Sequence, residues 1–170
     1  MLERDDQFAR LQYLFEQAGL GSGHLVFIGG EAGAGKSLLV QTFLDSIAAP
    51  ARVLIGWCDP VSPPRPAGPL VDMARGFGDP VSSVLRHENR PGLFDAVYAD
   101  LAGARRPTVL VFEDVHWADG TTLDLLRFLG RRLGTARPWS WQRTGRTRRD
   151  LTTRCGRDSV TWPPSLLSRG

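Results

Sequence analysis

The sequence contains almost no lysine, because Lys36 is the only one among its 21 basic side chains. Cysteine is also scarce: Cys58 and Cys155 lie far apart without CxxC spacing, which excludes a disulfide framework and a zinc site of the usual spacing. No apolar run approaches the length of a membrane span, and the N-terminus does not resemble a signal peptide. We therefore expect a cytoplasmic protein with no membrane partner.

The positive charge is concentrated at one end of the chain. The formal net charge is +3, and residues 138–170 carry +5 from seven arginines and two aspartates, which leaves −2 on residues 1–137. We therefore divide the chain into a domain, residues 1–137, and a basic tail, residues 138–170, expected to be disordered or the product of a frameshift. Nucleic-acid binding through basic charge would depend on the tail alone.

Residues 30–37 fit the phosphate-binding pattern G-x-x-x-x-G-K-[ST] without a mismatch. The apolar run 24–28 before them predicts a buried parallel strand, and residues 36–47 predict a helix. Glycines in such a turn adopt backbone angles closed to other residues, so that N–H groups converge on an anion at the start of the helix. The residues expected to bind the nucleotide are Gly30, Glu31, Ala32, Gly33, Ala34, Gly35, Lys36 and Ser37.

This loop favours a triphosphate with Mg²⁺ as its ligand. Lys36 would bridge the β- and γ-phosphates, and the Ser37 hydroxyl would ligate Mg²⁺. The alternative is a glycine-rich turn followed by a chance Lys-Ser pair. The position of the only lysine in an arginine-rich chain argues against it, because a compact ammonium among phosphates is a recurrent use of lysine.

The apolar stretch 108–112 predicts a strand that ends in two carboxylates, Glu113 and Asp114. In a nucleotide-hydrolysing site, an acid at the carboxyl end of a strand holds Mg²⁺ and a neighbour orients the attacking water. Consecutive side chains of a strand point to opposite faces, so the two acids have different roles. We assign Glu113 to the metal and Asp114 to water activation; a solvated turn is the alternative.

Local patterns predict the remaining elements. They are a helix to about residue 18 capped by Asp5 or Asp6, a strand at 52–56, helices at 70–77 and 93–104, and a helix at 120–133 with Asp119 as its N-cap. Two side chains have open interpretations. Arg65 belongs either to a proline-rich linker or to a segment over the nucleotide, and His116 either senses the γ-phosphate or packs beside Trp117.

Together these stretches resemble the ATPase module of large LuxR-type transcriptional regulators, an origin-recognition-like AAA ATPase domain of the signal-transducing P-loop NTPase class. The resemblance covers residues 2–137 and is most specific at residues 112–119, Phe-Glu-Asp-Val-His-Trp-Ala-Asp. It implies an α/β fold of the ASCE type, with a mostly parallel sheet flanked by helices. It also implies ATP as the ligand and slow hydrolysis used as a switch. Full-length relatives bind DNA through a C-terminal helix-turn-helix that is absent here, and self-association stays open.

The family pattern stops at Pro138. Read one base back, residues 141–145 can encode Ala-Thr-Tyr-Arg and residues 152–156 can encode His-Pro-Leu-Arg, two segments that the family carries in this order. Our hypothesis is a frameshift that replaced the native continuation and ended the chain early. The lost strand lies, in the family, between the acid-bearing strand and the phosphate-loop strand. We therefore expect a fold that is incomplete at the C-terminus, marginally stable and weak or inactive in ATP hydrolysis.

Two other functions are compatible with parts of the sequence. A small-molecule kinase uses the same phosphate loop, but it needs an arginine-bearing lid, and the arginines of residues 138–170 lack helical spacing. A nucleic-acid-binding protein would use the same arginines, and its binding would depend on salt. The stretch Trp117-Ala118-Asp119 favours the ATPase over the kinase, and nucleic-acid binding would be indicated by salt-dependent DNA binding that is lost on deletion of residues 138–170.

Overall fold

The computed structural model describes residues 2–30, 33–47, 51–61, 63, 65–87 and 91–133. Their elements, in chain order, are α1 (Leu2–Gly19), α2 (Lys36–Ile47), β1 (Arg52–Trp57), α3 (Gly68–Asp72), the 3₁₀ turn η1 (Ala74–Gly76), α4 (Asp79–Leu85), α5 (Leu93–Ala102), β2 (Thr108–Glu113), the 3₁₀ turn η2 (Val115–Trp117) and α6 (Gly120–Arg132). The predicted domain boundary at residue 137 lies outside the described residues.

The sheet of the described residues consists of two parallel strands. β1 pairs with β2 in register from Arg52 opposite Thr108 to Trp57 opposite Glu113. The chain between the strands passes through α3, η1, α4 and α5, as a parallel pair requires a crossover connection. Both strands predicted in this region are confirmed, and with them the α/β class.

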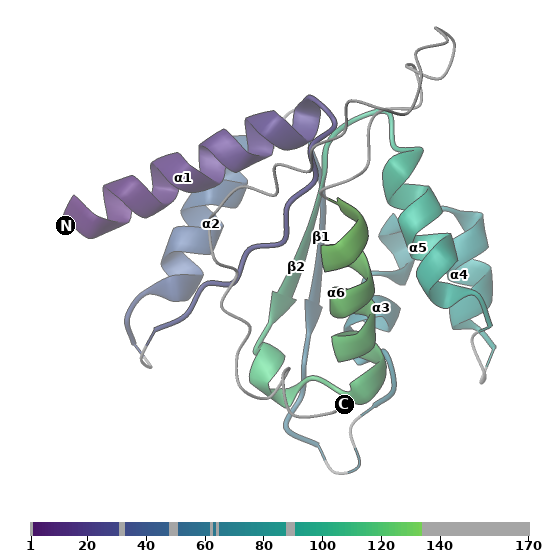
Figure 1. Ribbon diagram of the computed structural model, residues 1–170. Coiled ribbons are helices and arrows are strands. Elements are labelled where there is room, and N and C mark those ends of the chain that lie inside the picture. The colour runs from purple at the N-terminus through teal and green to yellow at the C-terminus, as the bar shows by residue number, and fades with distance from the viewer. Residues whose placement is uncertain are drawn as a thin grey trace, which may run out of the picture.

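Helices cover both faces of the sheet (Figure 1), with α1 and α2 on one face and α3 to α6 on the other. Alternation along the strands explains how one short strand contributes to both layers. Val53 and Ile55 of β1 pack with Phe43 of α2, whereas Leu54 between them packs with Leu70 and other side chains of the opposite layer. The prediction of a parallel sheet flanked by helices is therefore confirmed.

The segment before the phosphate loop is a correction to the sequence analysis. Residues 24–28 were predicted to form a buried strand, but they form no regular strand, and Val26 is 44% exposed. A strand exists only through hydrogen bonds to a neighbour. Among the described residues only β1 and β2 are paired as strands, so the apolar run is not part of the sheet.

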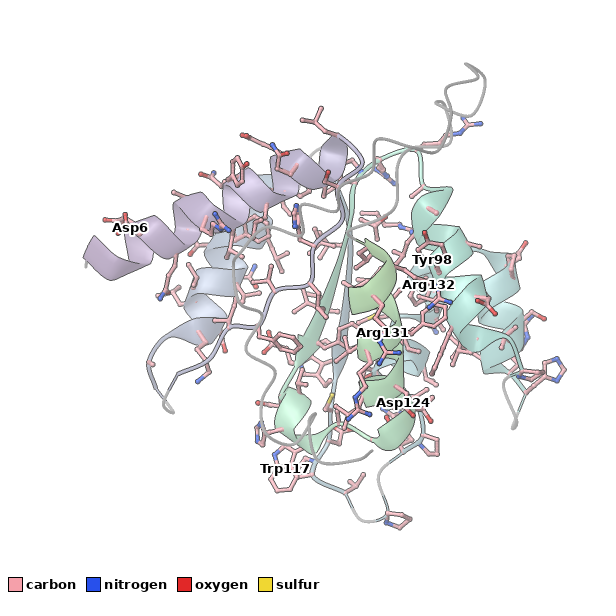
Figure 2. The ribbon with its side chains drawn as sticks, in the orientation of Figure 1. Asp6, Tyr98, Trp117, Asp124, Arg131 and Arg132 are labelled. Carbon is pink, nitrogen blue, oxygen red and sulfur yellow. The ribbon has the colours of Figure 1, made fainter. Side chains whose placement is uncertain are left out.

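The first helix begins earlier than predicted. α1 starts at Leu2, so Asp5 and Asp6 lie within the helix with exposed side chains rather than at its N-cap (Figure 2). Its inward side chains, such as Phe15, pack against α2, where the Phe15 and Phe43 rings meet edge to face with centroids 6.2 Å apart. No helix in the described part of the chain is both long and apolar enough to cross a membrane.

The crossover between the strands contains more helix than predicted. The helix predicted at 70–77 is split into α3, which starts at Gly68, and η1. α4 then occupies residues that looked like a polar connection, with Pro80 in its first turn and with Val81 and Leu85 buried in the core. The helices at 93–104 and 120–133 are confirmed, although α5 ends at Ala102 and α6 at Arg132.

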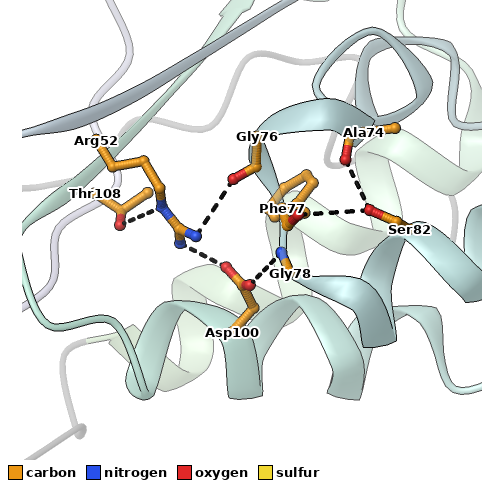
Figure 3. Close-up of polar contacts among 8 residues, drawn as sticks. All are labelled: Arg52, Ala74, Gly76, Phe77, Gly78, Ser82, Asp100 and Thr108. Atoms are coloured by element: carbon orange, nitrogen blue, oxygen red, sulfur yellow. Dashed lines mark hydrogen bonds and ion pairs between the residues drawn. The ribbon is translucent and has the colours of Figure 1, made fainter.

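An ion pair ties the crossover helices to the amino ends of both strands (Figure 3). The Arg52 guanidinium pairs with Asp100 of α5, donates to Thr108 Oγ1 at 3.0 Å and donates to the Gly76 carbonyl at 3.4 Å. The second Asp100 oxygen accepts the Gly78 N–H at 2.9 Å. Arg52 and Asp100 are both largely shielded from solvent, so this network fixes the end of the sheet opposite the phosphate loop.

Candidate functional site

The phosphate loop has the backbone geometry that its glycines predict. Gly30, Gly33 and Gly35 have φ angles of 153°, 77° and 72°, values that residues with a Cβ rarely adopt. A Cβ on Gly33 would meet no atom within 4 Å, so the backbone conformation and not crowding requires glycine there. Glu31 and Ala32, which the sequence also assigns to the loop, lie outside the described residues.

The loop leads directly into the N-terminus of a helix. α2 begins at Lys36, as predicted, and no acidic side chain occupies its first turn. The free N–H groups of a first turn and the helix dipole attract an anion, and nothing within that turn offsets their charge. A loop of this shape at such an end fits a phosphate group.

Lys36 and Ser37 occupy the first turn of α2. Lys36 Nζ donates a hydrogen bond to the Gly30 carbonyl at 2.8 Å, so that the ammonium lies over its own loop. Ser37 is exposed. The two side chains predicted to contact phosphate and Mg²⁺ therefore both lie at the loop, where the Lys36 ammonium is bonded to the first glycine of the pattern.

The acidic pair does not continue the strand as a regular ladder. Glu113 is the last residue of β2 and lies opposite Trp57. Asp114 has φ 54° and ψ 42°, the left-handed conformation, so the chain turns at this residue and Asp114 is exposed. The two acids thus differ in backbone conformation and in exposure, because Glu113 is half-buried at the end of the strand and Asp114 is exposed in the turn.

After the acids the chain forms η2, which carries His116 and Trp117. The Trp117 N–H donates to the Asp114 carbonyl at 2.8 Å and closes the turn. The His116 and Trp117 rings lie 5.2 Å apart, centroid to centroid, at 46°. This contact corresponds to the packing interpretation of His116. Figure 2 shows Trp117 at the end of the molecule where β2 ends, and its side chain is half exposed.

Asp119 caps α6, as predicted. One carboxylate oxygen accepts the N–H groups of Thr121 at 2.8 Å and Thr122 at 3.2 Å, and the other accepts the Thr122 hydroxyl. Asp119 and Thr122 are both buried. The cap therefore anchors the loop that follows Glu113 and Asp114 to the rigid start of a helix.

Arg65 is held by carboxylates. Its guanidinium donates to Asp72 at 3.0 Å and lies 3.6 Å from Asp59, while the other Asp72 oxygen accepts the Trp57 N–H at 3.3 Å. These contacts fasten the proline-rich segment to α3 and to the end of β1, in agreement with a connecting role. Sequence reasoning missed Asp72, because an aspartate within a short helix carries no motif.

Cys58 lies just beyond β1, and the sequence analysis did not assign it a structural role at the site. Its N–H donates to the Glu113 carbonyl at 3.1 Å and extends the strand pairing to the acidic pair. Burial, with the Asp119 and Asp114 carboxylates as further causes, raises the pKa of the Cys58 thiol to about 11. The thiol is therefore neutral and unreactive at physiological pH.

The phosphate loop and the acidic pair lie at the same end of the sheet (Figure 1). This is the carboxyl end of both strands, where open α/β sheets bind their ligands. In the part of the chain that the structure describes, no group of three or more His, Cys, Asp and Glu side chains is gathered to hold a metal. A Mg²⁺ ion at this end would need oxygens of the nucleotide in addition to Ser37 and Glu113.

Comparison with known proteins gives one family. A family model described as an AAA ATPase domain matches residues 1–141. The match includes the phosphate loop, the acidic pair and every described element. No curated protein and no solved structure matches the chain.

Proposed function

The chain belongs to the AAA ATPase domain family, and on that premise we propose that it is a regulatory module that binds ATP with Mg²⁺ at its phosphate loop. The observation that carries this proposal is the conformation of the loop. Gly30, Gly33 and Gly35 all have positive φ, and the helix that follows them starts at Lys36 without an acidic side chain in its first turn. These features fit a polyphosphate better than a neutral ligand.

Each loop residue has a defined role in this proposal. The backbone N–H groups of Gly30, Glu31, Ala32, Gly33, Ala34 and Gly35 surround the phosphates. Lys36, which now donates to the Gly30 carbonyl, turns to the β- and γ-phosphate oxygens. The ammonium would then exchange the Gly30 carbonyl for phosphate oxygens as acceptors.

At the carboxyl end of the sheet, Ser37 and Glu113 would hold Mg²⁺, and Asp114 would orient the attacking water. Bound ATP supplies the γ-phosphoryl group for hydrolysis. Asp114 is exposed and turned out of the strand, which suits a residue that contacts water. Glu113 is partly buried and held at its carbonyl by Cys58, which suits a residue that fixes a metal.

We further propose that the chain is a fragment of a LuxR-type transcriptional regulator whose continuation was altered near Pro138. In a full-length relative a C-terminal helix-turn-helix would bind DNA. This part of the proposal depends on the sequence resemblance and the codon pattern, because residues 134–170 lie outside the described residues. The genomic DNA downstream of codon 138 tests it: the neighbouring frame should continue an ATPase reading frame, and a stop codon there would refute the frameshift.

Titration calorimetry of the full chain with ATP and Mg²⁺ tests nucleotide binding. Lys36→Ala should weaken binding about tenfold or more, because a charge-assisted hydrogen bond to phosphate contributes roughly 1.5–3 kcal/mol. Arg86→Ala is a matched control, because it removes an exposed cation at the end of α4 and should leave the affinity unchanged. Equal affinities for the unmodified chain and Lys36→Ala, or no binding heat at all, would refute the proposal.

A further inference from the structure

The carboxyl end of β1 is held from both of its edges. In a parallel pair, successive residues of a strand direct their N–H groups alternately to the neighbouring strand and away from it. The Cys58 N–H donates to the Glu113 carbonyl at 3.1 Å, so the Trp57 N–H lies on the outer edge of β1. There it donates to the Asp72 carboxylate at 3.3 Å. Two consecutive residues of the chain are therefore fixed from opposite sides, one of them by the strand that carries Glu113.

Asp72 is itself fixed by its surroundings. It is the last residue of α3, and its second carboxylate oxygen accepts a hydrogen bond from Arg65 at 3.0 Å, so both oxygens have a partner. Arg65 also lies 3.6 Å from Asp59. The backbone of α3 lies directly against β1, because a Cβ on Gly56 would be 2.3 Å from the Pro69 carbonyl oxygen. The oxygen that accepts the Trp57 N–H therefore has little freedom to move.

Two features of α3 are locally unfavourable. Ala67, which precedes the helix, is fully buried and has φ 51° and ψ 32°, the left-handed conformation that residues with a Cβ rarely adopt. Asp72 places a negative charge at the C-terminal end of α3, where the free carbonyl groups disfavour an anion. Such features persist only where the surrounding structure offsets them, and they are more frequent at functional sites than elsewhere. The carboxylate at this position therefore serves something other than the stability of α3.

We propose that Asp72 is a positioning residue for Glu113 and thereby sets how tightly the site binds Mg²⁺, an inference that rests on the proposed role of Glu113 as a metal ligand. By holding the Trp57 N–H, Asp72 keeps the Cys58 N–H on the Glu113 carbonyl and fixes the backbone from which the Glu113 carboxylate extends. Without Asp72 the end of this strand pair would open more often. Loss of a group that orients a metal ligand typically lowers metal affinity about 10–100-fold.

A different role for Asp72 would be only to fasten the proline-rich segment through Arg65. That role needs the Arg65 contact alone, whereas the bond to the Trp57 N–H connects Asp72 with the strand pair that ends at Glu113. The two roles predict different effects on ATP binding. A loss of fastening would act on ATP affinity with and without metal, because it changes the stability of the whole domain. A loss of positioning would lower only the part of the affinity that depends on Mg²⁺.

Titration calorimetry of the full chain measures the magnesium ratio, which is the affinity for ATP with Mg²⁺ divided by the affinity with EDTA. Asp72→Ala should lower this ratio about tenfold. It should leave the affinity with EDTA within about twofold, because α2 and the phosphate loop lie on the other face of the sheet (Figure 1). Asp124→Ala is the matched control, because it removes another helical aspartate that pairs with an arginine, at 2.8 Å, and it should leave the ratio unchanged.

Two conservative variants separate geometry from charge and replace Asp72→Ala should that variant fail to fold. Asp72→Asn keeps an oxygen at the distance of the Trp57 N–H and loses the charge, so it should retain the ratio within about threefold. Asp72→Glu keeps the charge and the pairing with Arg65 but moves the oxygen by one methylene, so it should lower the ratio almost as far as alanine. The opposite order of these two variants would overturn the proposal.

Glu113→Gln, measured beside them, distinguishes failure of this inference from failure of the proposed function. If Glu113→Gln lowers the magnesium ratio and the Asp72 variants do not, the positioning role is refuted and the proposed function stands. The positioning role is also refuted if the Asp72 variants lower the affinity equally with Mg²⁺ and with EDTA. If Glu113→Gln leaves the ratio unchanged, or the unmodified chain binds no ATP, the role of Glu113 fails and this inference fails with it.

Hydrogen exchange of the Cys58 amide gives a second readout that requires neither metal nor nucleotide. Asp72→Glu and Asp72→Ala should accelerate its exchange about tenfold or more, because the bond to the Glu113 carbonyl opens more often. The Arg52 amide is the internal reference, since it donates to the Pro107 carbonyl at 2.9 Å at the other end of the same strand pair and should exchange as before. Unchanged exchange of Cys58, or equal acceleration of both amides, would refute the positioning role.

Discussion

Glu113 and Asp114 are adjacent in sequence but differ in backbone class: Glu113 ends the β2 ladder opposite Trp57, and Asp114 adopts the left-handed conformation at φ 54°. The chain leaves the sheet at Asp114, whose side chain is exposed. Aspartate tolerates this conformation better than most residues, yet it still carries strain. Backbone strain of this kind is found more often at functional sites than elsewhere, which agrees with the role proposed for Asp114.

We predict that the stability of Asp114 variants follows how well the new residue tolerates the left-handed conformation. Asp114→Gly should be as stable as the unmodified chain or up to about 1 kcal/mol more stable, whereas Asp114→Ala should lose about 1 kcal/mol, because alanine has a Cβ and no local hydrogen-bonding group. Asp114→Asn should stay within about 0.5 kcal/mol. Urea unfolding of the three variants measures this, and an alanine variant as stable as the glycine variant would contradict it.

Loss of the Asp119 cap should be costly. Asp119→Ala removes the acceptor of two backbone N–H groups and of the Thr122 hydroxyl, which is fully buried. We expect a loss of about 2–3 kcal/mol in the free energy of unfolding from the missing cap and the unsatisfied hydroxyl. Asp124→Ala, on the exposed face of the same helix, is the control and should change stability by less than about 0.5 kcal/mol. Similar effects of the two would show that the cap contributes nothing specific.

The close approach of α3 to β1 depends on Gly56. A Cβ at this position would lie 2.3 Å from the Pro69 carbonyl oxygen, a backbone atom that cannot move alone. Gly56→Ala should therefore destabilise the chain by about 2–3 kcal/mol through overpacking. Gly120→Ala is the matched control, because nothing lies within 4 Å of its added Cβ, and it should be neutral within about 0.5 kcal/mol. Thermal or urea unfolding compares them, and a stable Gly56→Ala would contradict the packing.

Elements with strong local signals could be predicted from the sequence. The start of α2 at Lys36 follows from the glycine pattern, and the start of α6 follows from Asp119 as a cap. β1 and β2 are continuous apolar runs that are too short for an ordinary helix and are preceded by a proline, Pro50 or Pro107, so their length and flanking residues indicate strands. The positive φ angles of the loop glycines follow from chemistry alone, because the pattern has no other reason to repeat glycine.

Features that depend on distant partners could not be predicted. Residues 24–28 have the composition of a strand, but a strand forms only where a neighbour pairs with it. α4 is short and is stabilised by packing of Val81 and Leu85 against other helices rather than by its own sequence. The roles of Asp72 and Cys58 come from contacts with residues far along the chain, Arg65 and Glu113. The left-handed conformation at Asp114 could not be predicted either, because the residue there is not glycine.

The raised pKa of Cys58 predicts a loss of stability at alkaline pH. The thiol has a pKa of about 11 in the folded chain against 9.0 for an ordinary cysteine, first because of burial and then because of Asp119 and Asp114. Well below pH 9 the thiol is protonated in both the folded and the unfolded chain, so its ionisation does not affect the free energy of unfolding. As pH rises from 9 to 11 the unfolded chain releases the proton and the folded chain retains it, which favours unfolding by up to about 2–3 kcal/mol.

The matched variant is Cys58→Ala, in which this contribution cannot occur. Urea unfolding at pH 8, 9, 10 and 11, in a Cys155→Ser background for both chains, should show the unmodified Cys58 losing stability more steeply than Cys58→Ala. Other groups also titrate in this range, but they are common to both chains, so the difference in slope isolates the thiol. Parallel curves would mean that the Cys58 thiol ionises as easily in the folded chain as in the unfolded chain. The surroundings of Cys58, Asp114 and Asp119 would then be more hydrated than the burial of Cys58 indicates.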